Sequence, residues 1–159
     1  MNKDLKIIAL DLGKNFAWAS NRIAPTVKGL RVGCRVFEGQ RAHRLGELLV
    51  FLQATLDVEA RAGRVSAIVY ETPFARGRDA TRSLWGIAGI IEACATNAGL
   101  PVVDVAVPTI KKFATGDGRG SKEAMTAAAK KFGYKGDNEH EADAVCLLRY
   151  AEANLERVL

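Results

Sequence analysis

The sequence predicts one α/β domain, residues 1–159, built on a five-stranded mixed sheet with helices on both faces. Two observations indicate this fold class. Three short segments with the pattern of strands come first in the chain, and two more strands then alternate with helical segments. Strands that follow one another directly pair antiparallel, whereas strands joined through a helix pair in parallel. We therefore expect the first three strands to form an antiparallel meander.

The strands are predicted where short apolar runs are rich in β-forming residues, as in KIIALD and VSAIVY. They lie at residues 6–11, 16–20, 30–37, 65–70 and 101–106. The helices are predicted where apolar residues recur with a period near 3.6. They lie at residues 41–61, 79–97, 108–113, 122–132 and 139–155. Ser121 is expected to cap the fourth helix, since a serine oxygen can accept the free backbone N–H groups there.

Composition excludes several classes of protein. No apolar run approaches the roughly 20 residues that span a bilayer, and the first residues lack the pattern of a secretory signal. Cys34, Cys94 and Cys146 are too scattered for a disulfide framework or a zinc site. We therefore expect a cytoplasmic protein with reduced thiols. The net charge of +5 is compatible with a polyanionic partner such as nucleic acid.

Acidic residues close two of the apolar strands. Asp11 ends the first strand and Glu71 ends the fourth, and such carboxylates are costly unless they are solvated, paired or bound to a cation. Asp143 and His140 share one face of the last helix because they are three residues apart. Each acid alone could be an ordinary turn, strand-end or helix-surface residue. Their joint placement suggests convergence on hard divalent cations such as Mg²⁺ or Mn²⁺.

Four segments resemble the RuvC family of Holliday-junction resolvases, which has the RNase H-like fold. They are IIALDLGKNFAWA, IVYETPFARGRDATRSLWGIAGII, VDVAVPTIKKFATGDGRGSKEAM and EHEADAVCLL, which follow one another in the family's order. The resemblance implies that Asp11, Glu71, His140 and Asp143 are the catalytic and metal-binding residues, holding two Mg²⁺ or Mn²⁺ ions. The implied activity is a crossover junction endodeoxyribonuclease that resolves four-way DNA junctions by paired symmetric nicks.

The chain departs from the family pattern at two places. The first turn reads Leu-Gly-Lys, where relatives commonly have proline or a small residue and then serine. Many relatives have aspartate where His140 stands, which leaves open whether His140 ligates a metal ion directly or orients the attacking water. Glu139, Glu141 and Asp137 are nearby alternatives for the last ligand. We expect Glu141 to lie off the shared face and Asp137 to precede the helix.

Basic residues flank these acids, and they are the predicted DNA contacts. They are Lys14, Arg76, Arg78, Arg82, Lys111, Lys112, Arg119 and Lys122. Phe74, in the loop after Glu71, is either a core plug or, as the resemblance suggests, an aromatic that stacks on an unpaired base. The resemblance also implies a homodimer. Residues 82–91, with Trp85, Gly86 and Gly89, are the candidate interface, and a buried core helix is the alternative.

Other functions compete with junction resolution. A branched-DNA or flap nuclease, or a ribosomal-RNA-processing nuclease of the YqgF type, could use the same acids on the same fold. Actin-like phosphotransferases have a similar first turn, but they need two such domains. A non-catalytic junction-binding protein would lack a complete acidic set, and this set looks complete. The sequence identifies no branch-migration helicase partner and does not distinguish a bacterial from a phage source.

Overall fold

The computed structural model describes residues 5–24, 26–74 and 77–154. Within them, five strands form one sheet in the order β3-β2-β1-β4-β5. The strands are β1 (Ile7–Asp11), β2 (Asn15–Ala24), β3 (Val27–Val36), β4 (Ala67–Glu71) and β5 (Val102–Val105). β1, β2 and β3 pair antiparallel, whereas β4 pairs in parallel with both β1 and β5. The predicted fold class and the predicted meander are confirmed.

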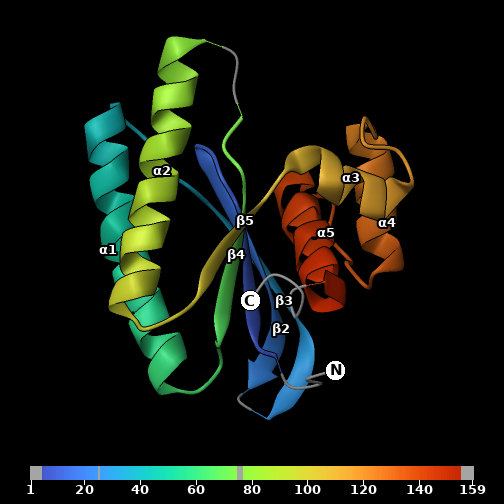
Figure 1. Ribbon diagram of the computed structural model, residues 1–159, viewed down its shortest axis with the longest axis horizontal. Helices are drawn as coiled ribbons and strands as arrows, with labels where there is room; N and C mark the ends of the chain where they lie inside the picture. Colours follow the sequence, from blue (N-terminus) through green and yellow to red (C-terminus); the bar gives the residue numbers. More distant parts are fainter. Residues whose placement is uncertain (1–4, 25, 75–76, 155–159) are drawn as a thin grey trace.

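Helices cover both faces of this sheet, as predicted. α1 and α2 pack on one face, and α3, α4 and α5 gather on the other (Figure 1). Their bounds are α1 (Arg41–Arg61), α2 (Arg78–Asn97), α3 (Val107–Thr115), α4 (Lys122–Lys131) and α5 (Glu139–Asn154). Ser121 caps α4 as expected, because its hydroxyl accepts the backbone N–H of Ala124 at 3.1 Å. Residue 155, the predicted end of the last helix, lies outside the described residues.

The central strand β1 is buried on both faces, and its side chains alternate between two cores. Ile7 and Ala9 belong to the core beneath α5, whereas Ile8 and Leu10 belong to the core beneath α1 and α2. β4 lies beside β1 in parallel register, with Tyr70 opposite Leu10, and repeats this alternation. The residue that follows Leu10 and the residue that follows Tyr70 therefore both turn toward α5.

The β2–β3 hairpin extends further than the sequence predicted. The missed part of β2 begins with the polar residues Asn21 and Arg22, and its pairing with β3 is interrupted by register shifts on either side of Arg22. Asn21 belongs to this extension because its side chain accepts the backbone N–H of Ile7 at 2.9 Å and donates to the carbonyl of Leu5 at 2.9 Å. A polar residue thus satisfies the backbone of the neighbouring strand, which an apolar alternation pattern does not reveal.

Two further predictions concern the cysteines and membrane-spanning helices. Cys34, Cys94 and Cys146 are free thiols, and the last two are buried. Among the described residues, no helix is long and apolar enough to cross a bilayer.

Candidate active site

The carboxyl ends of β1 and β4 bring Asp11 and Glu71 together. Each is the last residue of its strand, the two strands are parallel neighbours, and the alternation described above directs both side chains toward α5. Asp11 is only 6% exposed. The two predicted strand-end acids therefore share one edge of the sheet and one face.

α5 supplies the other two predicted residues from its first turns. Asn138 caps the helix, since its side-chain oxygen accepts the backbone N–H of His140 at 2.9 Å and of Glu141 at 3.2 Å. This cap fixes where His140 and, one turn later, Asp143 enter the site. The Nδ1 atom of His140 lies 3.1 Å from Oδ2 of Asp11. The sequence analysis did not identify Asn138.

His140 is held from both ring nitrogens. Opposite Asp11, the side-chain amide of Asn15 lies 3.0 Å from Nε2 of His140. An amide NH₂ group can only donate, so Nε2 accepts this bond and the proton of a neutral ring sits on Nδ1, where it is donated to Asp11. This tautomer is assigned from the hydrogen-bond network. Asn15 begins β2 and was missed by the sequence analysis, because no local pattern distinguishes it from any turn asparagine.

Burial raises the pKa values of all three carboxyl groups, and neighbouring negative charges raise those of Glu71 and Asp143 further. Burial, followed by the negative charges of Asp11 and Asp143, raises the pKa of Glu71 well above its ordinary value. Burial and the charge of Asp11 raise the pKa of Asp143 to about 6. Burial also raises the pKa of Asp11, although the hydrogen bond from His140 opposes the change. The charged forms of these carboxyl groups are therefore disfavoured unless a cation lies beside them.

Two of the predicted lysines lie beside this cluster. The positive charge of Lys111 on α3 lowers the pKa values of Glu71 and Asp143, against the larger effect of burial. Lys122, at the start of α4, forms an ion pair with Glu139 at 2.8 Å. An oxygen of Glu139 lies 3.8 Å from Nε2 of His140. Glu139 therefore links Lys122 to the edge of the site and remains an alternative ligand.

The other alternative ligands are engaged elsewhere. Glu141 accepts the hydroxyl of Tyr134 at 2.7 Å. Asp137 precedes α5 and pairs with Lys130 at 2.7 Å. Both expectations about these two acids agree with the structure, which leaves His140, Asp143 and, at the edge of the site, Glu139 as the groups that α5 presents to Asp11.

The remaining predicted DNA contacts lie around the site with different surroundings. Lys14 pairs with Glu38 at 3.0 Å on an exposed part of the surface. The other described cations of this set are exposed: Arg78, Arg82, Lys112 and Arg119. Arg76 lies outside the described residues.

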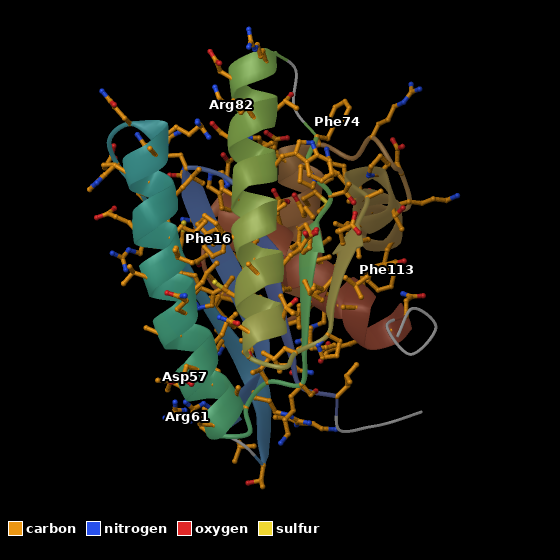
Figure 2. All side chains as sticks on the ribbon, turned by 60° about the vertical axis from the view of Figure 1, so that its left-hand side comes forward. Phe16, Asp57, Arg61, Phe74, Arg82 and Phe113 are labelled. Atoms are coloured by element: carbon orange, nitrogen blue, oxygen red, sulfur yellow. The ribbon has the colours of Figure 1, made fainter. Side chains whose placement is uncertain are left out.

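Phe74 is 78% exposed, which excludes the alternative that it plugs the core. It lies at the same end of the molecule as Arg82 (Figure 2). An exposed aromatic side chain in a loop next to Glu71 keeps its flat face available for stacking.

The candidate interface on α2 is divided between inward and outward residues. A side-chain carbon added at Gly86 would lie 3.1 Å from Leu45 of α1, so the close approach at Gly86 is to the chain's own helix. Gly89 has open space around it, and Trp85 is 53% exposed. The expectation that Gly86 serves an intersubunit contact is therefore corrected, whereas Trp85 and Gly89 remain on an outward face.

The donor set fits a pair of hard divalent cations. Carboxylate oxygens are the ligands that Mg²⁺ prefers, and Mn²⁺ also accepts an imidazole. Mutual repulsion among Asp11, Glu71 and Asp143 gives bound cations a favourable electrostatic environment. Among the described residues, however, no three histidine, cysteine, aspartate or glutamate side chains already form a metal-binding group.

Comparison with known proteins identifies the family. No model of a known protein family matches the chain. The crossover junction endodeoxyribonuclease RuvC of Anaeromyxobacter sp. (strain K) is 37% identical over 108 residues, which are 67% of this chain. The chain belongs to the RuvC family. The match spans little more than half of that RuvC protein, 56% of its length.

Solved RuvC structures share the fold. Thermus thermophilus RuvC aligns over 96% of this chain and 97% of its own, with a TM-score of 0.71 and 20% identity. T. thermophilus RuvC in complex with a Holliday junction substrate gives a TM-score of 0.72 with 21% identity, over 94% and 96% of the chains. The yeast mitochondrial Holliday junction resolvase is more distant, with a TM-score of 0.54 and 10% identity over 98% and 87%. The RNase H-like fold predicted for this RuvC-family chain is confirmed.

Proposed function

We propose that this chain is a metal-dependent endonuclease that resolves four-way DNA junctions by paired symmetric nicks. The observation that carries the proposal is the convergence of Asp11, Glu71 and Asp143 at one edge of the sheet, where burial raises the pKa of each carboxyl group. The name of the relative, a crossover junction endodeoxyribonuclease, supports the same activity. We expect it to act on DNA in the cytoplasm.

The site residues would have different roles in phosphodiester hydrolysis. Asp11, Glu71, Asp143 and His140 would hold two Mg²⁺ or Mn²⁺ ions, which would activate a water molecule and stabilise the charge that develops on the phosphate and the leaving oxygen. Asp11 accepts a hydrogen bond from the Nδ1–H group of His140 and so holds the imidazole in one orientation. Lys111 places a positive charge beside the carboxylates, where it can also attract the phosphate.

The surface around the site suits a polyanionic substrate. The net charge of +5 becomes +8 when the three site carboxylates are left out, so the acids are set in a basic surrounding. Lys14, Arg78, Arg82, Lys112, Arg119 and Lys122 would contact DNA phosphates. Phe74 would stack on a base that is unpaired at the crossover.

Paired symmetric nicks require two sites, and one chain holds one. We infer a two-fold homodimer in which the outward face of α2, with Trp85 and Gly89, meets its counterpart. A large exposed aromatic side chain beside an open glycine provides apolar area and room for close approach. Sedimentation of the protein with and without DNA tests this assembly, and a monomer in both samples would contradict it.

The decisive experiment for the function is incubation of purified protein with a synthetic four-way junction in Mg²⁺, Mn²⁺ or EDTA. We expect symmetric nicks in two opposite strands with either metal and no nicks in EDTA. A flap cut or RNA cleavage in place of paired nicks would favour the related nucleases of the same fold. Asp143→Asn should abolish cleavage. The control is Asp57→Asn, which should leave cleavage unchanged, because Asp57 is an exposed acid that pairs with Arg61 near the C-terminal end of α1.

A further inference from the structure

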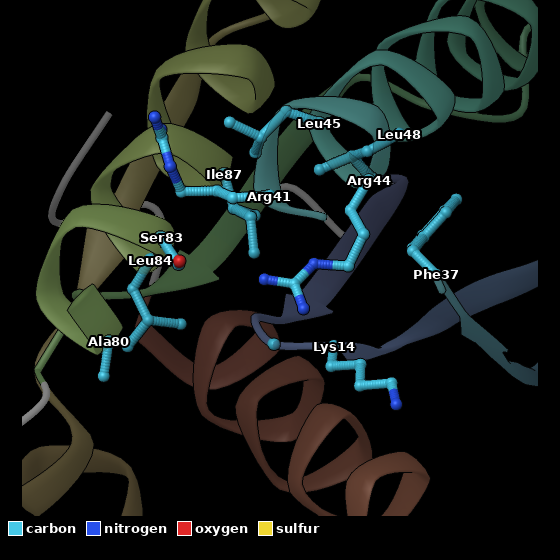
Figure 3. Close-up of a pocket in the computed structure, with 11 residues that line it drawn as sticks. Lys14, Phe37, Arg41, Arg44, Leu45, Leu48, Ala80, Ser83, Leu84 and Ile87 are labelled. Carbon is cyan, nitrogen blue, oxygen red and sulfur yellow. The ribbon is translucent and has the colours of Figure 1, made fainter. Parts of the chain in front are cut away.

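A pocket of about 220 Å³ opens between the first turns of α1, the first turns of α2 and the turn that joins β1 to β2 (Figure 3). None of the residues assigned above to metal binding lines it. Its walls come from three segments that are distant in the sequence, so no motif indicated it. The residues that line it include Phe37, Leu45, Leu48, Leu84 and Ile87.

The floor of the pocket is apolar and well packed. Leu48 and Phe37 are each 2% exposed and Ile87 is 8% exposed, because they belong to the core beneath α1 and α2. Ser83 is the one hydroxyl in the lining. A ligand that enters would therefore place a mainly apolar group on the floor and would meet few fixed hydrogen-bonding groups there.

The mouth of the pocket is cationic. Lys14, Arg41 and Arg44 line it, and Arg44 reaches from α1 toward the turn that carries Lys14 (Figure 3). Lys14 is paired with Glu38. Among the ion pairs found within the described residues, none involves Arg41 or Arg44. The two guanidinium groups therefore offer charge and planar donors to an anion next to an apolar cavity.

The pocket and the candidate active site share the turn between β1 and β2. Gly13 and Lys14 line it, and they follow Asp11 by two and three residues in the same turn. The same short turn therefore borders the site on the α5 side of the sheet and the pocket on the side of α1 and α2. The volume is below the roughly 300–1,000 Å³ of pockets for drug-sized ligands, which suits one flat ring system better than a larger molecule.

We propose that this pocket receives a single unstacked nucleobase of the bound DNA, while Arg41 and Arg44 hold the phosphates on either side of that nucleotide. The proposal rests on the nuclease function proposed above. An apolar floor beneath paired cations matches the two parts of a nucleotide, the apolar face of its base and its charged phosphate. Taking a base out of the stack costs a few kcal/mol, and this cost is smallest beside a crossover, where stacking is already interrupted.

The test scans a four-way junction with 2-aminopurine at each nucleotide flanking the exchange point, with the protein in EDTA so that nothing is cut. Unstacking should increase the fluorescence at a small number of positions when the wild-type protein binds. Ala80→Trp, at an exposed position in the lining, should fill the mouth and abolish the increase at the position whose base enters the pocket, while the junction still binds and any increase at a base next to Phe74 remains. Gln53→Trp, exposed on α1 away from the pocket, is the matched control and should behave as wild type.

Arg44→Gln provides a second variant that leaves the cavity in place. It should weaken junction binding and reduce the slope of log affinity against log salt by about 1, the loss of one phosphate contact. Arg61→Gln, an exposed arginine near the far end of α1, should leave the slope unchanged. A slope unaltered by Arg44→Gln would overturn the phosphate contact.

The two proposals fail in different ways. Wild-type protein that nicks the junction in Mg²⁺ but gives no fluorescence increase in EDTA would overturn the pocket assignment and leave the nuclease standing. Increases that Ala80→Trp leaves unaltered at every position would do the same. Absence of nicking in Mg²⁺ or Mn²⁺ would overturn the nuclease, and the fluorescence scan of the bound junction would still decide where the base goes.

Discussion

Two carboxylates at opposite ends of the molecule have nearly the same small solvent exposure but very different partners. Glu59, near the end of α1, is 7% exposed, and Asp11 is 6% exposed. Arg64 binds both oxygens of Glu59, at 2.8 and 3.2 Å, and Arg31 adds a contact at 3.4 Å. Asp11 has His140 as its basic partner and two further carboxylates as neighbours.

Burial acts to raise the pKa of both groups, and the charged partners decide whether that effect is reversed. Burial acts to raise the pKa of Glu59, but the hydrogen bonds and charges of Arg64 and Arg31 hold it below its ordinary value. Burial raises the pKa of Asp11, and one histidine does not reverse this change. One end of the molecule thus has a carboxylate whose charge is matched within the fold. The other end keeps an unmatched charge that cations from solution can balance, which is what a metal-dependent site requires.

The largest expected difference between the two ends is in catalysis. Asp11→Asn should reduce the rate of junction cleavage by about 10³-fold or more, since bound metal supplies several kcal/mol of transition-state stabilisation. The same change should raise the melting temperature of the metal-free protein at neutral pH, because it removes one of three repelling charges. Single-turnover cleavage and thermal melting in EDTA measure the two effects. A variant with most of the wild-type rate would remove Asp11 from the site.

Glu59→Gln should show the reverse pattern. It should lower the free energy of unfolding by about 1–3 kcal/mol, below the range for a fully buried pair because both arginines are partly solvated. Cleavage by the folded protein should not change, since Glu59 lies far from the site along α1. Urea denaturation and the cleavage assay separate the outcomes, and equal stability of the variant and wild type would contradict the argument.

Asn15→Ala tests the support of His140. We expect a roughly tenfold loss in cleavage rate, within the range for groups that orient a metal ligand, with little change in junction affinity. Asn15 acts as a positioning residue, so the variant should also change the imidazole resonances of His140 in metal-free protein. Asn21→Ala, which removes another β2 asparagine with side-chain bonds, is the control for general loosening of the strand. Unchanged His140 resonances in Asn15→Ala would count against this role.

The smallest expected effect is a pH dependence with opposite sign at the two ends. In metal-free protein the folded state holds the proton of Asp143 up to about pH 6, above the ordinary value of 3.8, so its contribution to stability falls as pH rises through this window. The folded-state pKa of Glu59 is lowered, so its contribution is present above the ordinary value of 4.5 and is lost as pH falls through the lowered pKa.

Variants distinguish these two contributions in melting experiments between pH 3 and 7. Asp143→Asn should flatten the upper part of the profile, and Glu59→Gln should flatten the lower part. Added Mg²⁺ should increase stability above about pH 6 and have little effect below it, because protons and cations compete for the carboxylates. Equal stabilisation by Mg²⁺ at pH 4 and pH 7 would contradict the competition.

The sequence predicted the order of elements and the four residues that meet at the site. Alternation along residues 6–11 and 65–70 is a local property, and the same alternation places Asp11 and Glu71 on one face. The i, i+3 spacing of His140 and Asp143 is equally local. The extension of β2 was missed because Asn21 and Arg22 interrupt the apolar alternation, and Asn21 instead bonds the backbone of Ile7 and Leu5.

The sequence by itself determined the order of strands and helices and the acids that end two of the strands, since these depend on periodicity within a few residues. Only the tertiary structure decided which charges are matched. Asn15 reaches His140 across 125 residues, Arg31 and Arg64 meet on Glu59, and the pocket beneath Arg41 and Arg44 joins three separate segments. Such contacts depend on how the helices pack on the sheet. A buried carboxylate becomes a stabilising pair or an unmatched charge according to the side chains that this packing brings to it.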